Sequence, residues 1–412
     1  MTKSESKSFN GNGQSRKRVL LWIEASRAYG RGCLLGIAAF VKSHQEWDLV
    51  HFDHVLGQDV PDQFAKLRID GLISRTDRRD VSDRLGRLGV PVVDLRGSAS
   101  PVRGQLFDTD PSGCAALAFE HFWNRGFRNM AFCGYRSVDW SDRRRMAFVD
   151  FARFRGIEPS MFVPDNELSR GPTMTHEVEG ELHDPRLTEW LARLPKPVAI
   201  LAANDVRGRQ ILSACAEARI PVPEQVAVLG IDNDDVVCEL ANPSLSSIQP
   251  DTFRLGFDGA KTLDRLMDAP DFATVEGVRL IPPRGVVERT STATMAIDDA
   301  EVALALEQIR KSSGAALSVD DLARSVRLSR ATLERRFRAA LGRSPRQQID
   351  QIRLARARSL VRESGLPLRL IAEEAGYSSL SRFSQAYQRH FHVYPDEDRA
   401  EHIRRDGYRL AR

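Results

Sequence analysis

One pattern occurs twice in residues 318–395, SVDDLARSVRLSRATLERRFRAALGRSPRQQIDQIRLARARSLVRESGLPLRLIAEEAGYSSLSRFSQAYQRHFHVYP. In the first copy, Ser318 and Ser329 stand where serine caps the start of a helix, and Gly342 stands where glycine ends one. Apolar residues recur every four positions along one face of the second helix: Leu333, Phe337 and Leu341. The first copy therefore predicts two short helices joined by a tight break, which is a helix-turn-helix.

The second copy follows about 49 residues later. Ile371 and Ala372 correspond to Leu322 and Ala323, whose small alanine allows two helices to cross closely. Ser378 is the predicted cap of the second long helix. Its apolar stripe is shifted by one residue and consists of Phe383, Tyr387 and Phe391. The repeat predicts two helix-turn-helix units connected by a basic helix.

The face opposite each apolar stripe carries side chains that can contact bases or phosphates. These candidate DNA-binding residues are Arg330, Ala331, Glu334, Arg335 and Arg338 in the first copy, and Ser381, Arg382, Ser384, Gln385 and Arg389 in the second. Residues 318–395 contain 15 arginines, no lysine and seven acidic residues, whereas the whole chain carries a net charge of +4. The alternative is the solvated face of an ordinary helical bundle. The repeated pattern and the segregated positive charge favour DNA binding.

This stretch resembles the double helix-turn-helix domain of the AraC family of bacterial transcription regulators. The resemblance covers about 100 residues and rests on five short segments: 333–337, 342–345, 353–361, 371–372 and 376–379. The end of the stretch departs from the family pattern, because Arg382, Tyr387, His392, Tyr394 and Asp398 stand where Tyr, Phe, Gly, Thr and Tyr are usual. The resemblance implies the fold, while these departures concern the bases that the second copy reads.

The composition of the chain indicates a globular protein without a membrane span. Of the 412 residues, 42% are hydrophobic and 28% are charged, and no apolar run approaches the roughly 18 residues that a membrane span needs. Residues 1–17 lack the apolar core of a signal peptide, so we expect a disordered tail and a cytoplasmic location. The five cysteines are scattered and form no Cys-x-x-Cys pair. We therefore expect buried thiols and no metal site.

Strand-like and helix-like segments alternate between residues 18 and 288, in two successive rounds. The clearest buried strands are Val19–Ile23, Ile69–Ile73, Met130–Gly134, Val198–Ala202 and Val226–Ile231. A helix near residues 254–267 is expected to return to the first lobe. This rhythm predicts two lobes with parallel, doubly wound sheets and a ligand cleft at the carboxyl ends of the strands.

Four segments of this region resemble the sugar-sensing domain of LacI/GalR-type repressors, which is itself similar to periplasmic sugar-binding proteins. They are residues 126–128, 204–205, 230–233 and 243–248. Such repressors carry an N-terminal DNA-binding domain, whereas here the predicted DNA-binding domain is C-terminal. This architecture resembles the bacterial regulators of D-xylose operons. We predict a tail (1–17), a two-lobed sensor (18–288), a linker (289–298) and a DNA-binding domain (299–412).

A pentose presents hydroxyl groups and apolar faces, so its site needs hydrogen-bond acceptors, a fixed guanidinium donor and an aromatic surface. The resemblance implies six ligand-binding candidates: Asp205, Asp232, Arg144, Trp140, Tyr29 and Asn204. Two arginines are weaker candidates: Arg27 and Arg75. The alternatives are that Asp205 caps the following helix, Arg144 is a surface charge and Trp140 packs in the core.

No motif of an enzyme stands out from the sequence. There is no Gly-x-Ser-x-Gly, phosphate-binding loop or His-Glu-x-x-His, and no carboxylate pair is singled out for glycoside hydrolysis. We expect a sugar-responsive transcription factor without a cofactor, acting as a homodimer on promoter DNA and RNA polymerase. Activation of a D-xylose operon is the favoured outcome. Repression, or a response to another small sugar, is the alternative.

Overall fold

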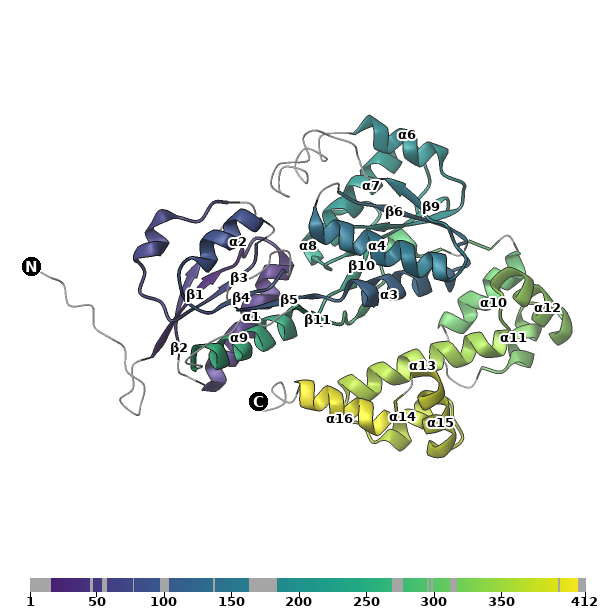
Figure 1. The fold of residues 1–412 in the computed structure, drawn as a ribbon. Coiled ribbons are helices and arrows are strands. Elements are labelled where there is room, and N and C mark those ends of the chain that lie inside the picture. Colours follow the sequence, from purple (N-terminus) through teal and green to yellow (C-terminus); the bar gives the residue numbers. More distant parts are fainter. Residues whose placement is uncertain are drawn as a thin grey trace, which may run out of the picture. The chain divides into compact units, whose positions relative to one another are not determined.

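The computed structural model describes residues 16–44, 47–53, 58–76, 78–96, 104–135, 138–162, 184–268, 277–294, 296–297, 299–311, 317–391 and 393–406. The chain forms two compact units, one of residues 1–122 and 127–294 and the other of residues 123–126 and 295–412. Of the predicted tail, residues 1–15 lie outside the described residues, and Lys17 is the first residue of a strand. Figure 1 shows the elements of both units.

The first lobe of the first unit is a parallel sheet in the order β11-β5-β4-β3-β1-β2. Its strands are β1 (Lys17–Trp22), β2 (Trp47–Phe52), β3 (Gly71–Ser74), β4 (Val92–Asp94), β5 (Gly104–Thr109) and β11 (Val278–Ile281). Its helices are α1 (Ala28–His44), the short 3-10 helix η1 (Asp62–Lys66), α2 (Arg79–Gly86) and α9 (Thr252–Asp268). Helix α9 therefore returns to this lobe, as its sequence predicted.

Helices cover both faces of this sheet. Val19 packs with α1 and α9, whereas the next residue, Leu20, packs with η1 and α2 on the opposite face. Burial on both faces explains why the strands are continuous apolar runs. Helices α1 and α9 approach closely because Gly36 has no side chain: a Cβ atom there would lie 2.0 Å from the carbonyl oxygen of Phe253.

The second lobe repeats this arrangement, with strand order β12-β10-β9-β8-β6-β7 and only β12 antiparallel. Its strands are β6 (Asn129–Cys133), β7 (Ser160–Phe162), β8 (Val198–Ala202), β9 (Val226–Ile231), β10 (Ser246–Gln249) and β12 (Gly285–Val287). Its helices are α3 (Pro111–Trp123), α4 (Asp139–Phe154), α6 (Pro185–Arg193), α7 (Asp205–Glu217) and α8 (Asp235–Leu240). The predicted pair of doubly wound lobes is confirmed. In folds of this kind, ligands bind at the carboxyl ends of the strands.

The second unit is helical. Its helices are α10 (Ala300–Lys311), α11 (Val319–Ser325), α12 (Arg330–Leu341), α13 (Pro345–Glu363), α14 (Leu368–Glu374), α15 (Leu380–Phe391) and α16 (Pro395–Asp406). Two separate cores hold it together: α10, α11 and α12 pack around one, and α14 and α15 pack around the other. Helix α13 contributes Ile349 to the first core and Leu354 to the second. The predicted double helix-turn-helix is confirmed, and helix α10 packs into its first core.

The helix ends follow the capping signals, with one correction. Ser318 and Asp321 form a reciprocal capping box, and Gly342 ends α12 with a left-handed φ of 70°. The prediction that Ser378 caps the second long helix is wrong. Helix α15 starts one residue later than the repeat predicts, and the Arg382 amide donates to Ser379 Oγ over 3.3 Å.

The predicted linker begins within the second lobe. Thr290–Thr292 form the 3-10 helix η4, in which Ser291 and Thr292 are fully buried. Residues 295 and 298 of the linker lie outside the described residues. All five cysteines are buried free thiols, as the sequence predicted. No helix in the described parts of the chain is long and apolar enough to cross a membrane.

Candidate functional site

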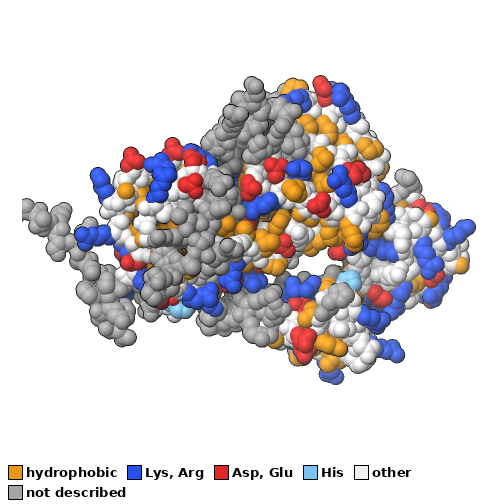
Figure 2. Space-filling view, viewed as in Figure 1, with side chains coloured by type: hydrophobic (Ala, Val, Ile, Leu, Met, Phe, Trp, Pro, Cys, Tyr) orange, Lys and Arg blue, Asp and Glu red, His pale blue; other side chains and the backbone are white. Residues whose placement is uncertain are grey.

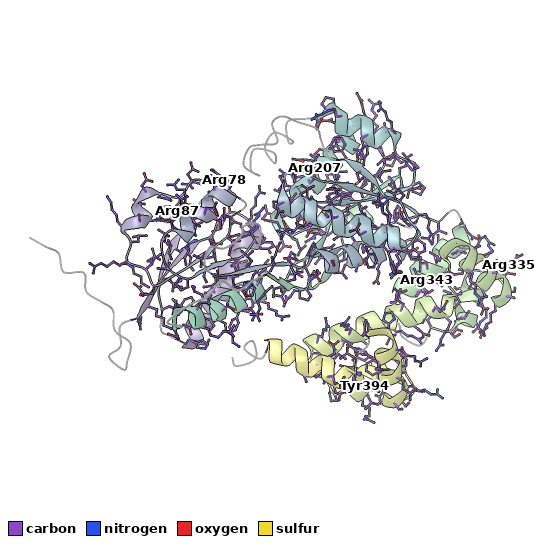
Figure 3. The ribbon with its side chains drawn as sticks, in the orientation of Figure 1. Arg78, Arg87, Arg207, Arg335, Arg343 and Tyr394 are labelled. Carbon is purple, nitrogen blue, oxygen red and sulfur yellow. The ribbon has the colours of Figure 1, made fainter. Side chains whose placement is uncertain are left out.

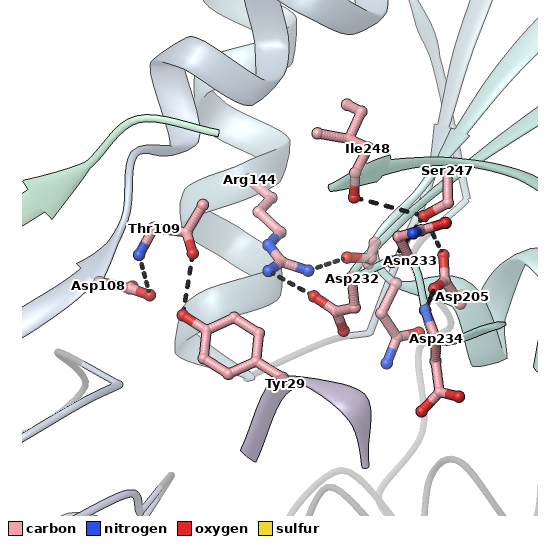
Figure 4. Close-up of polar contacts among 12 residues, drawn as sticks. Tyr29, Asp108, Thr109, Arg144, Asp205, Asp232, Asn233, Asp234, Ser247 and Ile248 are labelled. Atoms are coloured by element: carbon pink, nitrogen blue, oxygen red, sulfur yellow. Dashed lines mark hydrogen bonds and ion pairs between the residues drawn. The ribbon is translucent and has the colours of Figure 1, made fainter. Parts of the chain in front are cut away.

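A pocket lies between the two lobes of the first unit, where the carboxyl ends of their strands meet. It encloses about 600 Å³ of space, including the part open to solvent. All six predicted ligand-binding residues line it: Asp205, Asp232, Arg144, Trp140, Tyr29 and Asn204. The two weaker candidates, Arg27 and Arg75, line it as well. We refer to it as the interlobe pocket, and Figure 4 shows its polar contacts.

Arg144 and Asp232 form the charged centre of the interlobe pocket. Arg144 Nη2 lies 3.1 Å from Asp232 Oδ1, and Arg144 Nη1 donates to the carbonyl oxygen of Ala203 over 2.6 Å. The Arg144 side chain is 11% exposed, so it is not the surface charge that the sequence left open. Its guanidinium is a fixed donor fork beside an acceptor, which suits a ligand with several hydroxyl groups.

Asp205 is the most deeply buried carboxylate of the interlobe pocket. It accepts hydrogen bonds from Ser247 Oγ at 2.5 Å and from the Asp234 amide at 2.8 Å. It fits because Gly230 in β9 leaves room, since a Cβ atom there would lie 2.2 Å from Asp205 Oδ1. Burial and, secondly, the charge of Asp232 raise the pKa of Asp205 to about 8. Asp205 therefore carries a proton over much of the neutral range.

Asn204, and not Asp205, caps helix α7. Asn204 Oδ1 accepts from the Arg207 amide over 2.9 Å and from Tyr135 Oη over 3.3 Å. Asp205 is the first residue of the helix, and its side chain points to β10 and the β9–α8 turn. The cap thus fixes the backbone from which Asp205 enters the interlobe pocket.

Aromatic rings contribute the apolar part of the interlobe pocket. Trp140 is 6% exposed and lies between two guanidinium groups, at 5.3 Å from Arg96 and 5.1 Å from Arg144. Tyr29 is held by a 2.9 Å hydrogen bond between its hydroxyl and Thr109 Oγ1. These contacts fix the ring orientations, and a fixed ring can cover the C–H face of a small ligand.

Polar contacts join the two lobes around the pocket. Arg143 of the second lobe lies 3.0 Å from Asp108 of the first and donates to the Arg96 carbonyl oxygen over 3.1 Å. Asp234 of the second lobe accepts from the Ala28 amide over 2.9 Å. Burial raises the pKa of Asp108 to about 6, although Arg143 favours its charged form. Direct contacts between the two lobes therefore border the interlobe pocket.

A second candidate site is the exposed face of α12 and α15, which we call the arginine-rich face. Eight of the ten predicted DNA-binding residues are exposed, and Glu334 and Ser384 are half-buried. Figure 3 shows Arg335 projecting from α12, whereas Leu333 and Phe337 of the same helix are buried. Lys and Arg side chains are also visible on the surface of this unit in Figure 2. Helix α13 separates the two copies, and its 19 residues span about 28 Å.

The arginines of this face differ in their partners. Arg330 pairs with Asp320 of α11 and with Glu334, each at 3.1 Å. In the described part of the chain, Arg335, Arg338 and Arg389 form no ion pair, and Arg389 Nε donates only to the Gln385 carbonyl oxygen. Free guanidinium groups on a protruding helix are suited to contact phosphates or base edges.

Known proteins match the chain in three consecutive regions. Residues 18–103 match the XylR N-terminal domain, residues 119–292 a periplasmic binding protein-like domain, and residues 322–401 a helix-turn-helix domain. The xylose operon regulatory protein of Escherichia coli K12 is 29% identical over 398 residues, covering 93% of this chain and 97% of that protein. The protein of that name from Haemophilus influenzae is 28% identical and covers 93% and 98%.

Solved structures give the same result. The structure of the xylose-binding transcription activator XylR covers 94% of this chain and 98% of that chain, with a TM-score of 0.56 and 28% identity. The chain is a homologue of the xylose operon regulatory proteins. A LacI family regulator from Enterococcus faecium with bound ribose, at 20% identity and a TM-score of 0.53, shares the fold of the sensor.

As a homologue of these regulators, the protein is a transcription regulator with a periplasmic-binding-like sugar-sensing domain and an AraC-type helix-turn-helix domain. The predicted fold and the predicted class of function are confirmed. The named relatives are transcription regulators rather than enzymes. In the described residues no group of three His, Cys, Asp or Glu side chains is arranged to hold a metal ion.

The sequence reasoning missed several residues of the sensor's pocket: Arg96, Asp108, Val206, Asp234 and Val237. Asp108 and Arg96 stand at or just after the carboxyl ends of β5 and β4. The rule that ligands bind at these strand ends was applied to other strands and would have found both. The interlobe contact of Asp108 with Arg143 had no signal in the sequence, because the two residues come from different lobes.

Proposed function

We propose that the protein is a D-xylose-responsive transcription factor, in which the sugar binds the interlobe pocket and changes how the helix-turn-helix domain binds promoter DNA. The names of its relatives support D-xylose: two are xylose operon regulatory proteins, and a solved relative is a xylose-binding transcription activator. A pentose other than D-xylose is the alternative, because the polar groups of the pocket suit any small polyhydroxylated ring.

The observation that carries this proposal is the internal charge balance of the interlobe pocket. Arg144 pairs with Asp232, Arg75 pairs with the fully buried Glu24, and Asp108 pairs with Arg143. Charged groups that already have partners do not call for a charged ligand, because a further buried charge would be left uncompensated. They remain able to share hydrogen bonds with hydroxyl groups, so a neutral sugar fits best.

Each predicted ligand-binding residue has a part in this proposal. Asp205 and Asp232 accept hydrogen bonds from sugar hydroxyls, Arg144 donates to a sugar oxygen, and Trp140 covers an apolar face of the ring. Tyr29 and Asn204 line the same pocket and complete the set. Sugar binding then favours a closed arrangement of the lobes, to the extent that it contacts both.

The arginine-rich face is the proposed DNA-binding surface. Helices α12 and α15, held on either side of α13, would enter successive major grooves, which recur every 34 Å or so. The contacts are assigned to ten residues: Arg330, Ala331, Glu334, Arg335, Arg338, Ser381, Arg382, Ser384, Gln385 and Arg389. We further propose a cytoplasmic homodimer that activates a pentose operon through RNA polymerase. Repression of the same genes is the alternative.

A thermal-shift screen of the purified chain against pentoses and hexoses tests the sugar assignment. A ligand at 100 times its dissociation constant stabilises the folded state by about 2.7 kcal/mol, which raises the melting temperature by several degrees. We expect D-xylose to give the largest shift and its mirror image, L-xylose, to give none. A larger shift with another sugar would reassign the effector, and no shift with any sugar would refute a sugar-binding pocket.

A further inference from the structure

Arg289 links the segment that precedes the DNA-binding unit to the rim of the interlobe pocket. Its guanidinium donates to Glu239 Oε1 at 2.7 Å, to Asn233 Oδ1 at 2.9 Å and to Asp235 Oδ1 at 3.0 Å. It also donates to the Leu245 carbonyl oxygen at 3.1 Å. The Arg289 side chain is only 10% exposed, whereas its partners Asp235 and Glu239 are 80% and 65% exposed.

The residues that accept hydrogen bonds from Arg289 alternate with residues of the pocket along the turn between β9 and α8. Asp232 and Asp234 line the interlobe pocket, whereas Asn233 and Asp235, the residues next to them, accept from Arg289. Figure 4 shows Asp232, Asn233 and Asp234 in this turn, with Asp232 bonded to Arg144 on the pocket side. A displacement of the pocket side of the turn therefore moves the acceptors of Arg289.

The turn has a backbone conformation that its surroundings must hold. Asp232 has a φ of 117° and Asn233 a φ of 47°, both in the region that side chains disfavour. Such positions persist only where neighbouring contacts fix them. The Asn233 amide donates to Ser247 Oγ, and its side chain is held by Arg289. Strain of this kind makes the turn a candidate for two alternative arrangements.

The backbone on both sides of Arg289 is part of the second lobe. The Arg289 amide donates to Ser246 Oγ over 2.8 Å, and Ser246 Oγ donates to the Arg289 carbonyl oxygen over 3.0 Å. Ser291 then accepts from the Ser246 amide over 2.8 Å. Ser247, the next residue of β10, donates to Asp205 in the pocket. Strand β10 and the β9–α8 turn thus connect the pocket to the same short segment.

We propose that Arg289 is a positioning residue that transmits the sugar-bound state of the interlobe pocket to the segment leading to the DNA-binding unit. This inference rests on the proposed function. Sugar bound to Asp232 and Asp205 sets the turn, the turn sets Arg289, and Arg289 fixes where the chain leaves the sensor at residues 290–294. Arg289 itself does not line the pocket, so its loss separates sugar binding from the response to sugar.

The test compares Arg289→Ala with Arg284→Ala in the full-length chain. Arg284 lies five positions earlier and pairs only with Asp251 at 3.6 Å among the described residues, so its variant controls for loss of an arginine. D-xylose affinity is measured by calorimetry, and DNA affinity with a duplex selected from a random library by the native chain, with and without saturating D-xylose. We expect native and Arg284→Ala to change DNA affinity about 5- to 150-fold on adding D-xylose.

Arg289→Ala is expected to bind D-xylose within about tenfold of the native affinity, because Asp232 keeps its bond to Arg144, yet to change its DNA affinity by less than about twofold. A native-sized response in Arg289→Ala would overturn the inference. If native protein binds D-xylose without any change in DNA affinity, the proposed function fails first and the inference with it. The two failures are distinguished before any variant is measured.

A second pair of variants avoids the risk that Arg289→Ala does not fold. Asn233→Gly keeps the left-handed backbone at this position but removes the acceptor of Arg289, whereas Asn233→Asp keeps an acceptor. We expect Asn233→Gly to lose the response to D-xylose and Asn233→Asp to retain it. Equal responses in the two variants would show that the Arg289 bond has no part in transmission.

Discussion

Arginine is abundant in both the interlobe pocket and the arginine-rich face, but the two sites differ in whether these arginines are buried and paired with carboxylates. In the pocket, Arg144 and Arg75 are buried and each is paired with a carboxylate of the protein. On the helical face, Arg335 and Arg338 are exposed and form no ion pair within the described residues. A paired, buried guanidinium is a rigid donor for a neutral ligand, whereas an unpaired, exposed one is available for phosphate. The partner of an arginine, rather than its presence, distinguishes the two sites.

The largest expected effect is on the affinity of the interlobe pocket for D-xylose. Asp205→Ala removes a buried carboxyl group that we assign to the sugar and that also accepts from Ser247 Oγ and the Asp234 amide. Each buried polar group left without its partner costs about 1–3 kcal/mol, so D-xylose affinity should fall about 100-fold or more. DNA affinity without sugar should stay unchanged. Calorimetry and DNA titration measure the two quantities, with Asp258→Ala, on the distant helix α9, as the control. Loss of sugar-free DNA binding would contradict the assignment of Asp205.

The next effect is on the arginine-rich face. Arg335→Ala should cost about 1–3 kcal/mol on the selected duplex if Arg335 contacts a base, and much less on random DNA. Arg330→Ala should cost less, because Asp320 and Glu334 already compensate that charge. Competition titrations with the two duplexes measure both. An equal loss of affinity for both duplexes would make Arg335 a phosphate contact. A larger loss of affinity for Arg330→Ala would contradict the idea that unpaired arginines contribute more to DNA binding than paired ones.

A smaller effect is expected in the salt dependence of DNA binding. Arg338 is exposed and without an ion pair in the described structure, so it should release about one counterion when it meets a phosphate. Arg338→Ala should therefore lower the slope of log affinity against log salt by about 1. Arg324→Ala is the control, since Arg324 lies on α11 and is paired with Asp321. Identical slopes for native protein and Arg338→Ala would remove Arg338 from the contact surface.

The smallest effect is expected in the pH dependence of the free energy of unfolding, through the carboxyl group of Asp205. The pKa of Asp205 is raised from 3.8 to about 8, so the folded chain binds this proton where the unfolded chain has lost it. The resulting stability is present at low pH and is lost as pH rises through about 8. Melting of the sugar-free chain at about pH 6 and about pH 8.5 should show a larger loss for native protein than for Asp205→Asn, which cannot ionise. Equal losses would show that Asp205 is already ionised.

The sequence predicted what depends on local pattern. Apolar runs such as Val226–Ile231, with helical segments between them, predicted two doubly wound lobes, and the stripe of Leu333, Phe337 and Leu341 predicted a helix-turn-helix. Serine and glycine at helix ends predicted three boundaries correctly, at Ser318, Ser329 and Gly342. Ser378 failed as a cap because the second copy has one more residue in its break, and the one-residue shift of the stripe Phe383, Tyr387 and Phe391 was not carried over to the cap position.

What the sequence did not predict depends on partners that are distant along the chain. Asp108 meets Arg143 across the lobes, and Arg289 meets Asn233 from 56 positions away. The sequence predicts Arg289 as the first residue of a polar linker, since nothing near it in the sequence indicates burial. Whether an arginine is paired is a property of the folded chain. The six pocket candidates were implied by the family resemblance, and they lie together in the structure because all stand near strand ends or helix starts.

The protein is proposed to bind one neutral sugar beside the paired Arg144 and Arg75, and this sugar is proposed to control DNA binding at a face where Arg335 and Arg338 are unpaired in the described structure. This control of DNA binding is tested most directly by titrating the full-length chain with the selected duplex, in the presence of saturating D-xylose, of L-xylose or of no sugar. We predict that D-xylose tightens DNA binding about 5- to 150-fold and that L-xylose leaves it unchanged. D-xylose binding by calorimetry without any change in DNA affinity would contradict the account.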